Sequence, residues 1–247
     1  MKQQIYFKPI NRDFLVLPIQ YNHMIQGMIY DSLKAELADF LHGKGFSNEK
    51  RSFKMFTFSR LIGNYTIDKN KEKIIFNDAL SLVISSPYEE FCSSLATGLL
   101  VKKSIRLGDT ELEVVQSIME KEIVKDEEIR IQTLSPIVAY STFLRPDGRK
   151  YTCYFEPGES YYNELIENNL RKKYEAFYKE DAPEGGIMVK ALHKPKLSVI
   201  NYKQTIIKGY SGRYALTGPM PLLQMAVDSG LGSKNSQGFG CIELIKN

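Results

Sequence analysis

Cysteine is scarce in this chain of 247 residues, and its positions exclude two kinds of site. Cys92, Cys153 and Cys241 are odd in number, lie far apart and form no C-x-x-C pair. Neither a cysteine-based zinc site nor a framework of disulfide bonds is therefore predicted. So few cysteines are typical of a reducing compartment, and we expect the protein in the cytoplasm.

Long apolar runs are missing as well. No stretch approaches the roughly 18 apolar residues of a membrane-spanning helix, and Met1–Pro9 lacks an apolar core of signal-peptide length. We therefore expect no membrane partner. A strong excess of one charge is also absent: the net charge of +4 is only mildly basic and does not by itself indicate a polyanionic partner.

The order of predicted elements occurs twice along the chain. Each half begins with a strand, continues through a helix (21–41 and 160–178) and further strands to a second helix (88–100 and 221–227), and ends on a strand. Two β-α-β-β-α-β units explain this order. We predict an α+β fold of two tandem ferredoxin-like (RRM-like) domains.

A charged segment, EKEIVKDEE at 120–128, lies near the middle of the chain. We place the domain boundary there, which gives an N-terminal domain of residues 1–122 and a C-terminal domain of residues 123–247. The alternative is a solvated loop or strand end within one domain.

The most distinctive stretch is GLGSKNSQGFG at 230–240, between the predicted short helix and the last strand. A dinucleotide-binding motif would need a strand before the glycines and a helix after them, and a P-loop would need Gly-Lys-Ser/Thr at its end. Neither condition is met. Glycines permit close approach of backbone to a ligand, and successive N–H groups can form a concavity for anions. An extended phosphodiester would fit, although a plain tight connection would use the same glycines.

This stretch resembles a known motif. GLGSKNSQGFG followed by an apolar strand is similar to the C-terminal glycine-rich motif of the repeat-associated RNA-binding (RAMP) superfamily of CRISPR systems. LPIQYNHMIQGMIYDSL at 17–33 is similar to the N-terminal segment of one member family, the CRISPR-associated endoribonucleases of the sixth Cas family. FKMFTFSRL and TLSPIVAYS also resemble blocks of that family. The resemblance implies two ferredoxin-like domains and cleavage of precursor CRISPR RNA within its repeats.

Cleavage of RNA in this way requires no metal and no other cofactor. The 2′-hydroxyl attacks the adjacent 3′ phosphate while a base removes its proton and an acid protonates the leaving 5′ oxygen. The expected products carry a 2′,3′-cyclic phosphate and a 5′-hydroxyl, and DNA cannot be a substrate. Imidazole, which titrates near neutrality, is the group that this scheme needs most.

The chain has three histidines. His42 lies in ADFLHGKG, where the first helix must stop, and it matches the catalytic position of the family just after that helix. The alternative is that His42 only caps the helix C-terminus. His23 is the second candidate for catalysis, and His193, beside two lysines, is a candidate for contact with phosphate.

The family often adds a tyrosine from the first helix and a lysine from the following segment, and Tyr30 and Lys54 match those positions. Tyr30 could equally be a core aromatic residue, and Lys54 a solvated lysine for which Lys50 or Arg51 could substitute.

A geometric condition follows for the helix that carries Tyr30. On one unbroken helix, Tyr30 and His42 would lie about 18 Å apart at roughly 1.5 Å per residue. Both side chains can reach one phosphate only if the helix bends or ends before His42. We expect that break between Lys34 and Asp39.

Basic and aromatic residues alternate in NYKQTIIKGYSGRY at 201–214, a pattern suited to base stacking and phosphate contact. In a continuous strand Tyr202, Lys208 and Tyr210 share one face, although a hairpin with a solvated face fits the same residues. RKK at 171–173 is interpreted as solvated helix surface. The predicted RNA-binding residues are Gly230, Gly232, Lys234, Asn235, Ser236, Gly238, Gly240, Lys203, Lys208, Arg213 and His193.

The resemblance leaves two further questions open. A CRISPR effector complex and a homodimer are both compatible partners beside the repeat RNA. A non-catalytic RNA-binding subunit of such a complex would share the fold and the glycine motif, but it need not keep His42, Tyr30 and Lys54 together.

Overall fold

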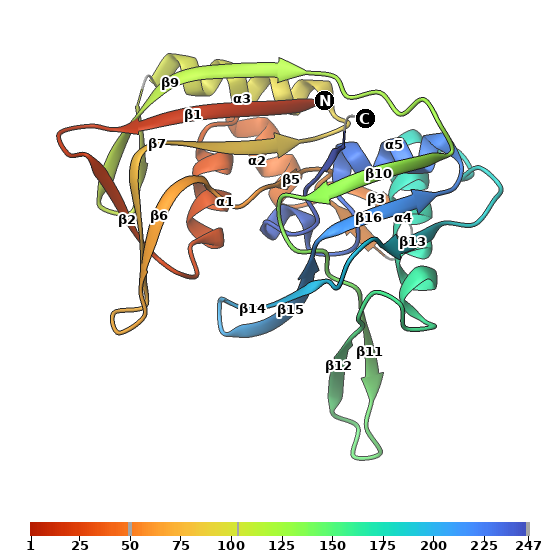
Figure 1. The fold of residues 1–247 in the computed structure, drawn as a ribbon. Helices are drawn as coiled ribbons and strands as arrows, with labels where there is room; N and C mark the ends of the chain where they lie inside the picture. Colours follow the sequence, from red (N-terminus) through yellow and green to blue (C-terminus); the bar gives the residue numbers. More distant parts are fainter. Residues whose placement is uncertain (49–50, 103, 246–247) are drawn as a thin grey trace.

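The computed structural model describes residues 1–48, 51–102 and 104–245, and it contains two main antiparallel sheets with helices packed on them (Figure 1). Lys50, one of the alternatives to Lys54, lies outside the described residues. Among the residues described, no helix is long and apolar enough to cross a membrane.

The first sheet has the long strand β7 (Lys73–Ser85) near its centre, beside β1 (Lys2–Pro9). β9 (Thr110–Glu120) pairs with the other side of β1 and also with β8 (Ser104–Leu107). Three short strands complete the sheet along β7: β2 (Phe14–Pro18), β5 (Thr57–Phe58) and β6 (Ile62–Asp68). Buried and more exposed side chains alternate along β1, so that Ile5 and Phe7 face the helices.

Three helices cover this sheet: α1 (Asn22–Asp31), α2 (Ala35–His42) and α3 (Glu89–Lys102). Each helix buries apolar side chains at helical spacing, such as Ile25, Met28 and Ile29 on α1 and Leu37 and Leu41 on α2. These side chains and the inner face of the sheet form one hydrophobic core.

The second sheet has the order β13-β16-β10-β17, and every pair in it is antiparallel. The strands are β10 (Glu128–Thr133), β13 (Met188–Ala191), β16 (Arg213–Thr217) and β17 (Ile242–Leu244), with helices α4 (Tyr162–Tyr178) and α5 (Met220–Ser229). The first strand of the unit therefore lies between the third and the fourth, as in a ferredoxin-like fold. The predicted α+β fold with tandem ferredoxin-like units is confirmed.

Residues 121–127 join the two sheets. The predicted boundary at residues 122/123 falls in this segment, and the division into two domains there stays a prediction.

Three hairpins extend from this framework: β3 (Phe46–Asn48) with β4 (Arg51–Phe53), β11 (Tyr140–Leu144) with β12 (Lys150–Tyr154), and β14 (Lys196–Tyr202) with β15 (Thr205–Ser211). The β11–β12 hairpin, which contains the predicted Pro-Asp-Gly turn, projects from the body of the protein (Figure 1).

Of the two interpretations of 201–214, the hairpin is confirmed and the continuous strand is wrong. Lys203 and Gln204 form a two-residue turn with φ angles of 45° and 66°, and Tyr202 pairs with Thr205. Because paired residues share a face, Tyr202 points inward and is 7% exposed, whereas Lys208 lies on the opposite, exposed face.

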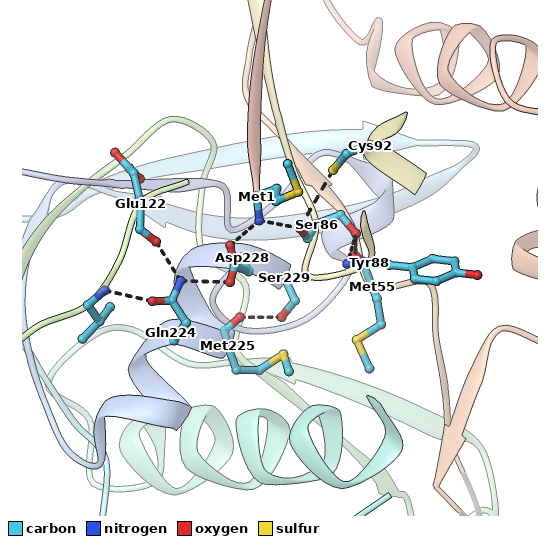
Figure 2. Close-up of polar contacts among 11 residues, drawn as sticks. Met1, Met55, Ser86, Tyr88, Cys92, Glu122, Gln224, Met225, Asp228 and Ser229 are labelled. Carbon is cyan, nitrogen blue, oxygen red and sulfur yellow. Dashed lines mark hydrogen bonds and ion pairs between the residues drawn. The ribbon is translucent and has the colours of Figure 1, made fainter. Parts of the chain in front are cut away.

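A polar network joins the two halves of the protein near the start of β1 (Figure 2). The amino group of Met1 contacts Asp228 Oδ1 at 2.6 Å and donates to Ser86 O at 2.7 Å. Gln224 Nε2 donates to Asp228 Oδ2 and to Glu122 O, both at 2.9 Å. These contacts fix the end of α5, immediately before the glycine-rich stretch.

Candidate functional site

The helix break required by geometry exists, slightly earlier than expected. α1 ends at Asp31 and α2 begins at Ala35, so the break spans Ser32 to Lys34 and only touches the predicted window. The rings of Tyr30 and His42 consequently meet edge to face, with centroids 6.0 Å apart.

Helix α3 determines where the break occurs. Ser94 Oγ accepts a hydrogen bond from Lys34 N at 2.9 Å, and Lys102 Nζ donates to Asp31 O at 2.5 Å. Gly98 allows close contact, since a Cβ there would lie 1.9 Å from Ser32 O. Residues 60 or more positions away in the sequence therefore position the break.

Lys54 joins Tyr30 and His42 at the end of α2. Its Nζ donates to His42 O at 3.1 Å and to Gly43 O at 3.4 Å, so the ammonium lies at the negative end of the helix. Burial lowers the pKa of Lys54. The structure thus brings the three residues predicted as catalytic to one place, with the His42 side chain exposed to solvent.

Tyr30 is half-buried and packs edge-on against both His42 and Phe56. Burial, with a smaller contribution from nearby Tyr202, raises the pKa of Tyr30 to about 12. Its phenol therefore remains protonated at neutral pH and can donate a hydrogen bond, but it cannot serve as a base.

The glycine-rich segment, residues 230–240, is attached to the first half of the protein through its backbone. Asn22 Nδ2 donates to Gln237 O at 2.9 Å, and Gln26 Nε2 donates to Ser236 O at 2.6 Å. Both donors lie on α1, the helix that carries Tyr30. The segment that follows α5 is thereby fixed to the helix that carries Tyr30.

The glycines of this segment mainly permit close packing within the protein. Gly240 has a φ angle of 71°, and a Cβ there would lie 2.0 Å from Leu231 O. At Gly238 a Cβ would lie 2.5 Å from the Phe58 ring. Gly230, Gly238 and Gly240 are buried, as is Asn235, whose Nδ2 donates to Phe239 O at 3.0 Å.

A pocket of about 640 Å³ lies between the two halves of the protein and reaches Lys54. Its walls come from residues 51–56, 138–142 and 232–236 and from α4. Within the described part of the chain, no Asp or Glu lines it. The cations that line it are Arg51, Lys54, Lys172, Lys173 and Lys234. Such a pocket attracts anions, because five basic side chains line it and none of the described carboxylates does.

Backbone amides add to this character. None of the described residues accepts a hydrogen bond from the backbone N–H groups of Lys234, Asn235 or Ser236, all of which line the pocket. The Lys234 ammonium lies over the Tyr140 ring at 5.0 Å from its centroid, and burial lowers the pKa of Lys234.

The other predicted RNA-binding residues lie elsewhere. Lys203, Lys208, Arg213 and His193 are exposed, and the described lining of the pocket contains none of them. Their contact with RNA stays a prediction. His23 is exposed on the first turn of α1, with Nδ1 3.1 Å from Gln20 O.

Sequence reasoning missed the contribution of α4, because the interpretation of RKK at 171–173 as solvated surface is wrong in part. Arg171 pairs with Glu167 at 2.9 Å, Lys172 lines the pocket, and Lys173 is 2% exposed. The available signal was the spacing of Ile166, Leu170 and Lys173 at i, i+4 and i+7, which places the lysine on the buried face of the helix.

Among the described residues, no group of three or more His, Cys, Asp and Glu side chains is placed to hold a metal ion. The side chains that do converge are an imidazole, a phenol and several cations. Such groups transfer protons and stabilise anionic oxygens.

Two family models together match most of the chain. The model described as "CRISPR-associated protein Cas6, N-terminal" matches residues 16–119, and the model described as "CRISPR associated protein Cas6, C-terminal" matches residues 118–244.

Curated relatives match along nearly the whole chain. Over 237 residues, the sequence is 32% identical to "CRISPR-associated endoribonuclease Cas6 1" of Methanocaldococcus jannaschii, which covers 95% of this chain and 90% of that protein. It is 27% identical over 244 residues to "CRISPR-associated endoribonuclease Cas6" of Pyrococcus furiosus, with 93% and 84% covered.

Solved structures share the fold. One titled "CRISPR associated protein Cas6" aligns with a TM-score of 0.79 at 27% identity, over 100% of this chain and 99% of that one. Another, titled "An RAMP protein binding different RNA substrates", aligns with a TM-score of 0.84 at 22% identity over the whole of both chains.

Proposed function

The chain belongs to the Cas6 family of CRISPR-associated proteins, and on this premise we propose that it is an endoribonuclease that cuts precursor CRISPR RNA within its repeats. The observation that carries the proposal is the meeting of Tyr30, His42 and Lys54 at the edge of a cationic pocket lined by the glycine-rich segment.

The proposed reaction uses the 2′-hydroxyl of the RNA as its nucleophile and proceeds without a metal ion. The exposed imidazole of His42 transfers a proton, either from the 2′-hydroxyl or to the leaving 5′ oxygen. The protonated phenol of Tyr30 and the ammonium of Lys54 stabilise the charge that develops on the phosphate oxygens. The products are a 2′,3′-cyclic phosphate and a 5′-hydroxyl.

Lys54 must change its hydrogen bonds to take this role. Its ammonium donates to the carbonyls of His42 and Gly43. A phosphate oxygen beside His42 would offer a charged acceptor in place of these neutral ones, and charge-assisted hydrogen bonds are the stronger kind.

The cationic pocket is proposed to hold the RNA backbone next to the scissile phosphate. Lys234 and the uncommitted amides at 234–236 supply donors on one side, and Lys172 supplies charge on the other. The chain of phosphates would run past Lys54, which belongs to both the pocket and the Tyr30–His42 pair.

Cleavage of repeat RNA in EDTA by the wild type and by His42→Ala tests the proposal. A second substrate carries a 2′-deoxy sugar at the mapped cut, and His23→Ala is the matched control because it removes another exposed histidine. We expect the wild type and His23→Ala to cut the all-ribose substrate only, and His42→Ala to bind it without cutting.

Three results would contradict the proposal in different ways. If the wild type binds the RNA but does not cut it, the protein is a non-catalytic RNA-binding subunit. If cleavage stops in EDTA, the metal-independent mechanism is wrong. If His42→Ala cuts as fast as the wild type, the assignment of His42 is wrong.

A further inference from the structure

Lys173 is a buried cation with an unusual set of partners. Its side chain lies inside the protein, and Nζ donates to Gly230 O at 2.6 Å and to Gly232 O at 3.2 Å. Among the described residues, no carboxylate forms an ion pair with it. The ammonium therefore binds two carbonyls of the glycine-rich segment and has no counterion in the part of the chain that the structure describes.

An ordinary helix would carry an apolar residue at this position. Lys173 continues the buried face formed by Ile166 and Leu170, which pack in the core of the second half. Burial of an unpaired ammonium costs free energy. For the same reason, burial lowers the pKa of Lys173 to about 7. A role outside simple core packing would explain why a lysine stands there.

An anion that entered the pocket would supply the negative charge that the Lys173 ammonium lacks. The charged groups that line the pocket with it are Arg51 and Lys54 from the β4–β5 region, Lys172 from α4 and Lys234 from the glycine-rich segment. All four are cations, so none favours the protonated form of Lys173. A phosphate bound among them would favour it.

We propose that Lys173 is a positioning residue whose ammonium holds the Gly230 and Gly232 carbonyls and so keeps the glycine-rich segment in its RNA-binding shape. This inference rests on the proposed function. RNA binding in turn retains the proton on Lys173, because the phosphates supply the missing negative charge.

The inference predicts a pH dependence of affinity with a defined sign. Below pH 7 free Lys173 is already protonated, and its contribution to RNA binding does not change with pH. Above pH 7 binding must add a proton, so the affinity falls as the pH rises, by at most about tenfold per pH unit.

The test compares Lys173→Met with Lys172→Met, which removes one positive charge from the same pocket but no contact with the glycine carbonyls. Affinity for repeat RNA with a 2′-deoxy sugar at the cut is measured at pH 6.5 and at pH 8.5. We expect Lys173→Met to bind roughly tenfold or more weakly at pH 6.5, since hydrogen bonds to a charged group are lost. Between pH 6.5 and pH 8.5 the affinity of the wild type and of Lys172→Met should fall by a similar factor. The affinity of Lys173→Met should fall less over this range.

Turnover separates positioning from a direct role in catalysis. With all-ribose RNA, Lys173→Met should show a raised KM and a kcat within a few fold of the wild type, because Tyr30, His42 and Lys54 belong to the other half of the protein. A lowered kcat with unchanged KM would overturn the inference, as would unchanged affinity with unchanged pH dependence.

A second variant guards against misfolding. If thermal melting shows that Lys173→Met is unfolded, Lys173→Gln keeps a hydrogen-bond donor without the titratable charge, and it should bind RNA with the Lys173 part of the pH dependence lost. Wild type-like pH dependence in that variant would overturn the inference. Failure of the proposed function would look different, since the wild type itself would bind no repeat RNA or would bind it without cutting it.

Discussion

Replacing Gly98 by alanine should lower the cleavage rate as well as the stability of the protein. Gly98 lies on α3, where a Cβ would be 1.9 Å from Ser32 O in the break between α1 and α2. Ordinary contact between two such atoms begins at about 3.5 Å. Helix α3 and the break must therefore separate by roughly 1.5 Å at this point. The break positions His42 relative to Tyr30, and the pair would be displaced.

In Gly98→Ala two effects on the free energy of unfolding oppose each other, whereas a single effect acts on the cleavage rate. Overpacking costs about 1–3 kcal/mol, while exchange of glycine for alanine within a helix contributes about 1 kcal/mol. The free energy of unfolding should therefore fall by about 2 kcal/mol or more, because the atoms that the new Cβ meets belong to the backbone. A displacement of about 1 Å at a catalytic group can lower the rate roughly 100-fold.

Gly27→Ala is the matched control. It makes the same chemical change on α1, the helix that carries Tyr30, but no atom lies within 4 Å of the added Cβ. We expect a gain of about 0.5–1 kcal/mol in the free energy of unfolding and unchanged cleavage. Urea denaturation and single-turnover cleavage measure the two effects. Wild-type cleavage by Gly98→Ala would refute the argument that the break positions the Tyr30–His42 pair.

Three other variants test separate parts of the molecule. Tyr30→Phe keeps the edge contacts with neighbouring rings but removes a hydroxyl that stays protonated, so single-turnover cleavage should fall roughly 100-fold with unchanged melting temperature; an unchanged rate would exclude Tyr30 from catalysis. Neutralising Lys203, Lys208 and Arg213 together should weaken RNA binding and reduce the slope of log affinity against log salt by about 2 if all three contact phosphates of a single strand; an unaltered slope would show that RNA does not reach this face. Asp228→Asn removes the charged partner of the Met1 amino group and should lower the free energy of unfolding by roughly 1–3 kcal/mol in urea denaturation, whereas wild-type stability would show that the polar network does not hold the two halves together.

The parts of the fold that follow from local signals could be predicted from the sequence. Pro146, Asp147 and Gly148 form a turn by their own conformational preferences, and the hairpin around them was expected. For 201–214 a hairpin was one of two alternatives, and its turn could not be placed, because neither Lys203 nor Gln204 is typical of a two-residue turn. Its positive φ angles are adopted between two strands whose inner face is buried.

The site depends more strongly on contacts between distant segments. Geometry required a break before His42, but Ser94 and Gly98 of another helix determine its position, and no local pattern near residue 33 contains that information. Lys173 could have been identified as buried from its spacing with Ile166 and Leu170. Its partners could not, because the Gly230 and Gly232 carbonyls reach it only through the packing of α4 on the segment after α5.

The glycine-rich segment is held to the first half of the protein through main-chain atoms. Asn22, Gln26 and Thr57 all donate to carbonyl oxygens, of Gln237, Ser236 and Phe239 respectively. A carbonyl is present whatever the side chain, so substitution of the pocket-lining side chains at 233, 234 and 236 leaves these three hydrogen bonds in place. Related proteins could therefore adapt to repeats of different sequence by substitution at these positions alone, while the distance between the bound RNA and the cleaving groups stays the same.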